Sequence, residues 1–316
     1  MNFAILGGGA FGTALALVLS RDGSNVALWS RDADDADAMR TTRKTGRALP
    51  NIDLPETLTI PHGIPDAEIT LIAVPAQSVR AFLEQHRNAL SGRTLISCAK
   101  GIERGTGLGP VDVIRSVLPD GKAGCLTGPS FASDIAIGLP TALVLAIEDD
   151  AERIQAALNR PSFRVYRTAD VAGAQLGGAV KNVIAIAAGI AIGAGLGDSA
   201  RASVIARGFA EMARYGRLKA ARTETIQGLS GLGDLVLTCT SEKSRNFMAG
   251  KLLGEGKAID GGTTVEGLAT AQAVAVEAAR LNVDMPLTSA ISAVVEGRLD
   301  IPTAIETLLA RPAGKE

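Results

Sequence analysis

A glycine-rich segment near the start of the chain has the spacing of a dinucleotide-binding loop. Residues 7–12 read Gly-Gly-Gly-Ala-Phe-Gly, which matches the pattern G-x-G-x-x-G and lies between an apolar run and an apolar helix pattern. In this pattern Gly7 permits a tight turn, Gly9 lets the backbone approach a pyrophosphate, and Gly12 lets the helix pack against the strand. A helix that starts near Ala10 would aim free N–H groups at the phosphates. Although glycine clusters also serve ordinary turns, this context favours dinucleotide binding.

The end of the second apolar run predicts which dinucleotide is preferred. The sequence there is Ser-Arg-Asp, at the place where NAD-selective sites carry an acidic residue for the ribose hydroxyls. The guanidinium of Arg31 can instead pair with a 2′-phosphate, so we expect NADP to be preferred and NAD to be the second cofactor. Arg43, Lys44 and Arg47 could add positive charge nearby. Two alternatives stay open: Asp32 could reach the ribose, and Arg31 could be a solvated residue at a strand end.

A lysine is the predicted general base. The two histidines, His62 and His86, fall in a loop and at a polar helix end, and we interpret both as ordinary surface residues. Lys181 differs, because it is the only charged residue between Asp170 and Asp198 and lies in a helix pattern of small apolar residues. An ammonium in such a helix must face a cleft or a partner, unless it extends to solvent at the helix edge. Burial or a second cation favours the neutral, proton-accepting form of a lysine.

Other polar residues stand at predicted strand ends and helix starts. Lys100 follows the apolar run 94–97, and open α/β sheets bind ligands at the carboxyl ends of their strands. Residues 126–132 form a second strand-to-helix turn, whose N–H groups could hold substrate or nicotinamide or could simply cap a helix. Asp234 lies in a Gly-Leu-Gly-Asp sequence, and residues 244–246 (Ser-Arg-Asn) open a helix pattern. A hydroxyl, a guanidinium and an amide at a helix start could form a phosphate receptor.

Two kinds of secondary structure must position these residues. Short apolar runs predict strands over Phe3–Leu6, Val26–Trp29, Ile69–Val74, Thr94–Ser97, Gly124–Leu126 and Ala142–Ile147. Amphipathic patterns between strands predict helices over Ala10–Arg21 and Gln77–Ala89. Later patterns are all helical, over Ala169–Ile192, Ser199–Ala221, Ser244–Leu253, Val265–Leu281, Pro286–Glu296 and Ile301–Leu309. The predicted fold is an α/β Rossmann-type doubly wound domain with a parallel sheet over residues 1–167, followed by an all-α domain over residues 168–316.

Composition limits the class of protein. A chain of 316 residues exceeds what one core usually serves, which agrees with two domains. With 32 basic and 33 acidic residues the net charge is −1, so no nucleic-acid partner is expected. The apolar run 183–197 is shorter than a bilayer span, so we expect a buried core helix and no membrane insertion. The N-terminus enters a strand pattern at once, without a basic region or a cleavage signature, so no signal peptide is expected. Three scattered cysteines and two histidines favour a reducing, cytoplasmic compartment and no metal site.

Taken together, these segments resemble bacterial-type NAD(P)-dependent glycerol-3-phosphate dehydrogenase over nearly the whole chain. Two stretches are highly specific: Gly-Gly-Ala-Val-Lys-Asn at residues 177–182 and Gly-Leu-Gly-Asp-Leu-Val-Leu-Thr-Cys-Thr at residues 231–240. The segments 99–101, 128–132, 244–246 and 265–267 also match in type and order. The resemblance implies an enzyme that interconverts sn-glycerol 3-phosphate and dihydroxyacetone phosphate with NAD(P)(H), supplies phospholipid synthesis and forms a homodimer.

The resemblance also implies roles for individual residues. Lys181 would accept the hydroxyl proton in oxidation and return it in reduction, and Lys100 would contact both substrate and cofactor. The implied substrate site consists of Lys100, Gly128, Ser130, Lys181, Asp234, Ser244, Arg245 and Asn246. The implied cofactor site consists of Gly7, Gly9, Ala10, Phe11, Gly12, Arg31, Lys100, Ala132, Arg245, Thr264 and Glu266. Departures from the family are Phe247-Met248, where relatives often carry another arginine, and Thr264, which is often apolar in relatives.

Two other interpretations stay open. A β-hydroxyacid dehydrogenase, such as a 6-phosphogluconate or hydroxyisobutyrate dehydrogenase, also pairs a Rossmann domain with a helical domain and a lysine on the linking helix. The segments 231–240 and 244–246 argue against it, and a substrate panel would decide. An NADP-binding redox sensor without catalysis is the non-enzyme alternative. The presence of Lys181, Lys100 and Asp234 argues against the sensor.

Overall fold

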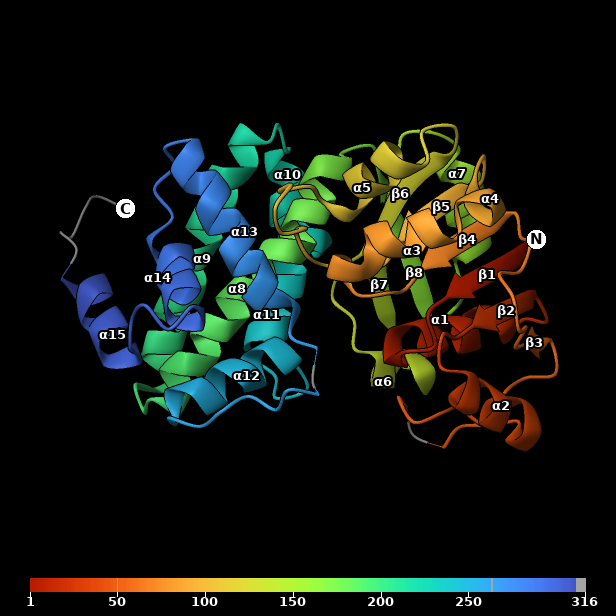
Figure 1. Cartoon of the computed structure of the whole chain (residues 1–316), viewed down its shortest axis with the longest axis horizontal. Helices are drawn as coiled ribbons and strands as arrows, with labels where there is room; N and C mark the ends of the chain where they lie inside the picture. Colours follow the sequence, from red (N-terminus) through yellow and green to blue (C-terminus); the bar gives the residue numbers. More distant parts are fainter. Residues whose placement is uncertain (50, 263, 311–316) are drawn as a thin grey trace. The chain divides into compact units, whose positions relative to one another are not determined.

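The computed structural model describes residues 1–49, 51–262 and 264–310 and divides into two compact units (Figure 1). The first unit combines Met1–Lys100 with Gly109–Gln175, and the second combines Gly101–Leu108 with the described part of Leu176–Glu316. The predicted boundary after residue 167 falls inside the last strand of the first unit. Positions 311–316 of the predicted all-α domain lie outside the described residues.

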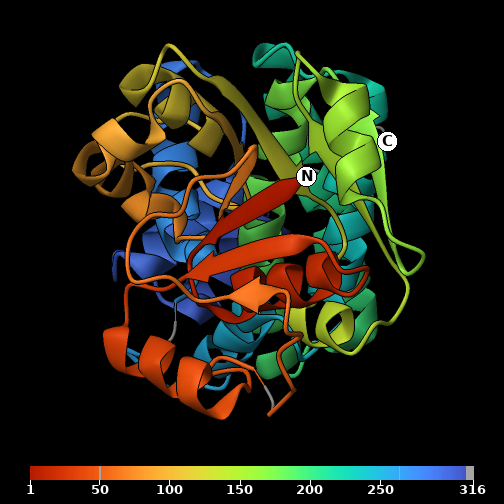
Figure 2. The same ribbon diagram turned by 90° about the vertical axis from the view of Figure 1, so that its right-hand side faces the viewer.

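The first unit is built on an eight-stranded sheet with the order β3-β2-β1-β4-β5-β6-β7-β8. The strands are β1 (Asn2–Leu6), β2 (Asn25–Trp29), β3 (Leu58–Thr59), β4 (Ile69–Ile72), β5 (Thr94–Ser97), β6 (Lys122–Thr127), β7 (Thr141–Ala146) and β8 (Phe163–Thr168). Figure 2 shows β1 and β2 side by side, in the parallel register that pairs Phe3 with Val26. The first six strands are parallel, so the Rossmann-type fold is confirmed.

The last two strands depart from the predicted all-parallel arrangement. Strand β7 runs antiparallel to β6, and β8 is parallel to β7. Between β6 and β7 the chain forms only the short helix α6 (Ala132–Ala136), whereas α7 (Ala151–Leu158) makes a full crossover from β7 to β8. A parallel pair needs a longer crossover than an antiparallel one, so the short α6 agrees with the reversal.

The helices of the first unit bury their apolar faces against the sheet. They include α1 (Ala10–Ser20), α2 (Ala33–Thr42), α3 (Val79–Gln85), α4 (Arg87–Leu90) and α5 (Pro110–Val117). Helix α1 is buried over residues 12–20, as expected for the helix that follows a dinucleotide loop. The helix predicted over residues 77–89 is interrupted at His86. That imidazole is half-buried rather than on the surface, and it packs with Phe82 against the ring of Trp29 at the end of β2.

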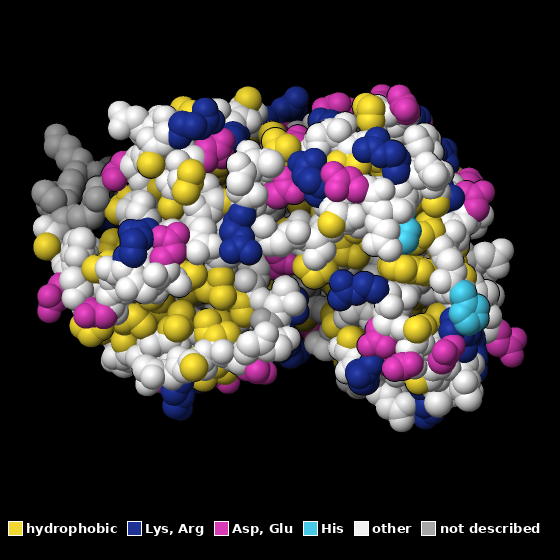
Figure 3. All heavy atoms as spheres, viewed as in Figure 1, with side chains coloured by type: hydrophobic (Ala, Val, Ile, Leu, Met, Phe, Trp, Pro, Cys, Tyr) yellow, Lys and Arg dark blue, Asp and Glu magenta, His cyan; other side chains and the backbone are white. Residues whose placement is uncertain are grey.

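The second unit is helical in its described part, and the residues outside the described part are grey in Figure 3. Its elements are α8 (Val171–Gly193, which begins in the first unit), α9 (Gly197–Leu218), α10 (Thr223–Gln227), the π-helical turn η2 (Leu229–Gly233), α11 (Asp234–Cys239), α12 (Arg245–Gly254), α13 (Glu266–Arg280), α14 (Pro286–Val295) and α15 (Ile301–Leu309). Helix α8 is long and apolar enough to cross a membrane, but most of it is buried inside the protein. The prediction of a buried core helix is therefore confirmed.

Glycines let α8 and α12 pack with their backbones in contact. A Cβ atom at Gly189 would lie 2.0 Å from the carbonyl oxygen of Phe247, and one at Gly250 would lie 2.0 Å from that of Ile186. No side chain fits at such distances, so the closeness of the two helices depends on glycine at both positions. This contact fixes the start of α12, which carries three predicted site residues, relative to α8, which carries Lys181.

Candidate active site

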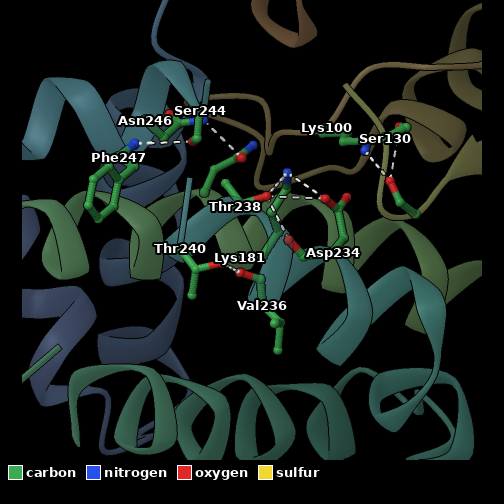
Figure 4. A network of polar contacts seen from close by, with 12 residues as sticks. Lys100, Ser130, Lys181, Asp234, Val236, Thr238, Thr240, Ser244, Asn246 and Phe247 are labelled. Atoms are coloured by element: carbon green, nitrogen blue, oxygen red, sulfur yellow. Dashed lines mark hydrogen bonds and ion pairs between the residues drawn. The ribbon is translucent and has the colours of Figure 1, made fainter. Parts of the chain in front are cut away.

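Lys181 lies in the middle of α8 and is almost fully buried, with 6% of its surface exposed. Its Nζ donates hydrogen bonds to Asp234 Oδ1 at 3.0 Å and to Thr238 Oγ1 at 2.8 Å. Asp234 is 1% exposed, so the ammonium and the carboxylate form a buried ion pair (Figure 4). The isolated lysine, which we expected to face a cleft or a partner, thus has a partner in Asp234. A buried charge pair persists only when hydrogen bonds satisfy both members, and this pair meets that condition.

Thr238 is a site residue that the sequence analysis did not single out. It follows Asp234 by four residues on α11, so the two side chains share one face of the helix. Its Oγ1 lies 2.6 Å from the Asp234 carbonyl oxygen, to which it donates, and 3.1 Å from Asp234 Oδ1. With its proton directed toward Asp234, the hydroxyl oxygen is oriented to accept from the lysine. The i to i+4 spacing after an aspartate was the signal that could have identified it.

The start of α12 is built as a capped helix N-terminus. Ser244 is buried and its Oγ accepts the N–H of Phe247 at 3.2 Å, so this hydroxyl caps its own helix. Arg245, the first residue of the helix, is exposed, and its side chain makes no hydrogen bond or ion pair with any residue that the structure describes. Its guanidinium is available for an anion in the solvent beside the helix N-terminus.

Asn246 joins three helices of the second unit. Its Nδ2 donates to Asn182 Oδ1 at 2.9 Å, and its Oδ1 accepts the N–H of Gly267 at 2.9 Å. Asn182 follows Lys181 directly on α8, and Gly267 lies in the first turn of α13 next to Glu266. One N–H of the Asn246 amide remains for a ligand. Sequence reasoning gave Asn182 no role, because its contact is with a residue 64 positions away.

The glycine-rich loop of the first unit has the geometry of a dinucleotide-binding turn. Gly7 has φ +131°, and a Cβ there would lie 2.5 Å from the carbonyl oxygen of Ala73. A Cβ at Gly12 would lie 2.0 Å from the carbonyl oxygen of Gly7, so this position needs glycine for helix–strand packing. Nothing lies within 4 Å of a Cβ at Gly9. The backbone is therefore open at Gly9, directly before α1 starts at Ala10, where a pyrophosphate would approach.

Asp32, which left cofactor choice open, has a structural task. Its Oδ1 accepts the N–H of Asp35 at 3.0 Å and caps α2, while its Oδ2 lies 2.5 Å from Nη2 of Arg47. Arg47 also contacts Asp35 at 3.3 Å. Arg31 is exposed and has no hydrogen-bond or ion-pair partner in the described part of the chain.

The other basic residues near this strand end also contact polar groups of the first unit. Arg43 donates to the carbonyl oxygens of Leu58 at 3.1 Å and Pro55 at 2.6 Å. Lys44 lies 3.8 Å from a carboxylate oxygen of Asp53. Whereas Arg43, Lys44 and Arg47 all have partners, the charge of Arg31 is engaged by no described residue.

The carbonyl oxygen of Gly128 accepts hydrogen bonds from two side chains, those of Lys100 and Ser130. Lys100 Nζ donates to the oxygen of Gly128 at 2.9 Å, and Ser130 Oγ donates to the same oxygen at 3.1 Å (Figure 4). Gly128 has φ +129°, which favours glycine at this turn after β6. Lys100 Nζ also lies 6.0 Å from the ring centroid of Phe11 in α1. The first unit thus brings together four residues predicted for the site from three separate segments.

The three cysteines are buried and free, as expected. Burial raises the pKa of the Cys125 and Cys239 thiols to about 12 and raises that of Cys98 further. None of these thiols is therefore suited to act as a nucleophile at neutral pH. Within the described chain no cluster of His, Cys, Asp and Glu has the arrangement of a metal site.

Comparisons with known proteins agree along the whole chain. Residues 2–153 match the model of the NAD-dependent glycerol-3-phosphate dehydrogenase N-terminus, and residues 170–306 match that of its C-terminus. Similar curated proteins, named glycerol-3-phosphate dehydrogenase (NAD(P)+), come from Ruegeria sp. (51% identity) and Roseobacter denitrificans (52%), each aligned over all of both chains. The crystal structure of glycerol-3-phosphate dehydrogenase from Coxiella burnetii is 37% identical, with TM-score 0.92, and covers 98% of this chain and 99% of its own.

Proposed function

Because the chain belongs to the NAD(P)-dependent glycerol-3-phosphate dehydrogenase family, we propose that it interconverts sn-glycerol 3-phosphate and dihydroxyacetone phosphate. The observation that carries this proposal is the buried group of Lys181, Asp234 and Thr238. It provides an acid–base residue on a helix that otherwise contains no charged residue. Reduction of the ketone, which supplies glycerol 3-phosphate for phospholipid synthesis in the cytoplasm, is the proposed direction in the cell.

The described residues of the first unit fit a nicotinamide dinucleotide. The open backbone at Gly9 and the N-terminus of α1 would receive the pyrophosphate. Phe11, Ala132 and Lys100 are the further cofactor residues that we propose in this unit. For the second unit, the family resemblance proposes Arg245, Thr264 and Glu266 as cofactor residues. When bound, the cofactor supplies or accepts the hydride.

Lys181 would move the proton. In oxidation the neutral amine takes the proton of the C2 hydroxyl as the C2 hydride departs, and in reduction the ammonium returns it to the C2 oxygen. Asp234 stabilises the ammonium form, and Thr238 holds Nζ in one direction. Lys100 would contribute a second positive charge near the C2 oxygen and stabilise developing alkoxide.

The phosphate of the substrate would bind at the start of α12. Arg245 offers an uncommitted guanidinium, Asn246 offers one N–H, and the capped helix end offers a favourable dipole. Ser244, which caps the helix, and Gly128 and Ser130, at the turn after β6, complete the proposed substrate site. Holding the phosphate would orient C2 for hydride transfer.

We propose NADP as the preferred cofactor. The support is that both oxygens of Asp32 are occupied within α2 and its loop, while Arg31 has no partner among the described residues. An uncommitted guanidinium at this strand end favours a 2′-phosphate. A homodimer remains a proposal, and sedimentation of the purified protein would test it.

The deciding experiment follows dihydroxyacetone phosphate-dependent loss of NADPH absorbance with wild type and Lys181→Ala side by side. Wild type is expected to turn over, and folded Lys181→Ala is expected to lose several orders of magnitude in kcat. Activity that survives in Lys181→Ala would contradict the role of the lysine but leave the reaction standing. Absence of turnover in wild type with both NADPH and NADH would contradict the reaction itself.

A further inference from the structure

The π-helical turn η2 presses directly against α8 through glycine. A Cβ atom at Gly177 would lie 2.7 Å from the carbonyl oxygen of Ser230 and 2.9 Å from Cα of Gly231. Both neighbours are backbone atoms, which cannot rotate away as a flexible side chain could. Gly231 is equally confined, because its Cβ would lie 2.0 Å from the carbonyl oxygen of Ile226. The turn therefore fits between α10 and α8 only when both positions lack a side chain.

The two glycines at this contact lie close in sequence to the buried ion pair, Gly177 to Lys181 and Gly231 to Asp234. Gly177 precedes Lys181 by four residues on α8, so the two share one face of the helix. Gly231 precedes Asp234 by three residues, and η2 leads without a break into α11. The separation of η2 from α8 at Gly177 thus determines how far Asp234 lies from Lys181, where the bond is now 3.0 Å.

We propose that Gly177 and Gly231 are positioning residues for the proton-transferring lysine. By letting η2 approach α8 backbone to backbone, they bring the Asp234 carboxylate and the Thr238 hydroxyl within hydrogen-bond distance of Lys181 Nζ. The inference rests on the proposed function, because the role of Lys181 is part of it. It also explains why glycine occurs in both sequence stretches that were most specific for the family.

The substitution Gly177→Ala would increase the distance between η2 and α8, and the contact distances show by how much. A Cβ seldom lies closer than 3.4 Å to another heavy atom, so a contact of 2.7 Å forces η2 and α8 apart by several tenths of an ångström. The Lys181–Asp234 hydrogen bond would lengthen beyond the favourable range. Because the carboxylate then stabilises the ammonium less, the neutral amine forms at lower pH.

The experiment compares the pH dependence of kcat for glycerol 3-phosphate oxidation in wild type and Gly177→Ala. A substrate deuterated at C2 establishes at each pH that hydride transfer limits the rate. We expect the midpoint of the rising limb to move to lower pH by about half a unit, from the weakened Coulomb interaction. The kcat at the plateau should fall about tenfold, because the lysine is no longer held in line, with a smaller change in KM.

Gly193→Ala is the matched control. It makes the same substitution on the same helix against backbone, since a Cβ at Gly193 would lie 2.1 Å from the carbonyl oxygen of Lys251. It is expected to lower Tm while the pH midpoint stays at the wild-type value. A merely structural role of Gly177 would give the same pattern in both variants, and an unchanged midpoint in folded Gly177→Ala overturns the proposal.

Ser230→Ala keeps the proposal testable if Gly177→Ala does not fold. Ser230 Oγ donates to the carbonyl oxygen of Thr225 at 3.3 Å and ties η2 to α10. Removing this hydroxyl loosens the turn without a steric clash, so the midpoint should move in the same direction by a smaller amount. No shift in Ser230→Ala would overturn the proposal. A wild-type enzyme without turnover would instead contradict the proposed function, so the two failures are distinguishable.

Discussion

Single residues in this protein take their roles from what else contacts them, and Asp32 is the clearest case. An aspartate at the end of the second strand suggests NAD by its type, yet here it caps α2 and pairs with Arg47. The neighbouring Arg31 is left to define the charge of this strand end. Residue type alone left the role of Asp32 open, and the hydrogen bonds of the folded chain give its carboxylate a structural role.

Arg31→Ala should raise the KM for NADPH about 10- to 100-fold, because hydrogen bonds to a charged group contribute about 1.5–3 kcal/mol. The KM for NADH should change little, since NADH lacks the 2′-phosphate. Lys44→Ala is the matched control, because this nearby lysine already faces Asp53 at 3.8 Å. Steady-state kinetics with both cofactors measure the effect. Equal losses with NADPH and NADH would show that Arg31 does not select between them.

Thr238→Val should lower kcat about 10- to 100-fold, because the isosteric side chain removes a hydrogen bond to a buried ammonium. Thr240→Val is the control on the same segment. Its Oγ1 donates to the carbonyl oxygen of Val236 at 2.7 Å, and its side chain is exposed. Kinetics of both variants at saturating substrate would separate the two positions. Equal kcat in wild type and Thr238→Val would exclude an orienting role for the hydroxyl.

At the scale of helices and strands, the long periodic patterns were predictable and the short irregular ones were not. Helix α15 was predicted with its observed bounds, and α8, α13 and α14 within two residues at each end. Strand β3, with two residues, carries too little pattern to detect. Strand β8 does alternate buried and exposed residues at its start and could have been recognised. The turn η2 depends on contacts of Gly177 and Gly231 that arise only in the folded chain.

The same division holds for the candidate site. Lys181 could be identified because a charge in a long apolar helix has few explanations. Thr238 and Asn182 could not be distinguished from ordinary polar residues, because their importance lies in contacts with residues far along the chain or across a helix turn. Asn182 meets its partner only once the glycines of α8 and α12 have brought the two helices together.

Hydrogen bonds between α13 and the C-terminal end of α9 lead to a prediction about stability. Glu277 of α13 accepts hydrogen bonds from Tyr215 of α9 and from Lys219, the residue that follows α9. Burial alone would raise its pKa, but the bonds from Lys219 and Tyr215 outweigh burial and hold the pKa below its usual value of 4.5. A carboxyl group with a lowered pKa stabilises the fold above pH 4.5, and this contribution is lost as the pH falls through the folded-state pKa.

Glu277→Gln should therefore destabilise the protein by about 2 kcal/mol at pH 7, and the difference from wild type should shrink below pH 4.5. Chemical denaturation at pH 7 and pH 4 measures the effect. Glu296→Gln is the control, because its ion pair with Arg298 lies on the surface. A difference between wild type and Glu277→Gln that does not depend on pH would show that the charge of Glu277 contributes nothing.

At the scale of the whole molecule, the chain passes between its two units more often than a linear division of the sequence suggests. Residues 101–108 belong to the second unit although residues on both sides belong to the first. Within that unit, Arg104 reaches Gln272 of α13 at 3.3 Å. No local pattern marks this excursion, so a prediction from sequence placed a single boundary near residue 167. Three connections, near residues 100, 108 and 175, join the two units covalently.

Trp29 is the only tryptophan in the chain, and it packs against Phe82 and His86 inside the first unit. Its emission therefore reports the integrity of the sheet unit alone, while far-ultraviolet circular dichroism is weighted toward the helices of the second. A denaturation followed by both signals reveals how the units are coupled. Superimposable curves mean that the two units unfold as one cooperative structure, and separate curves mean that one unit unfolds before the other.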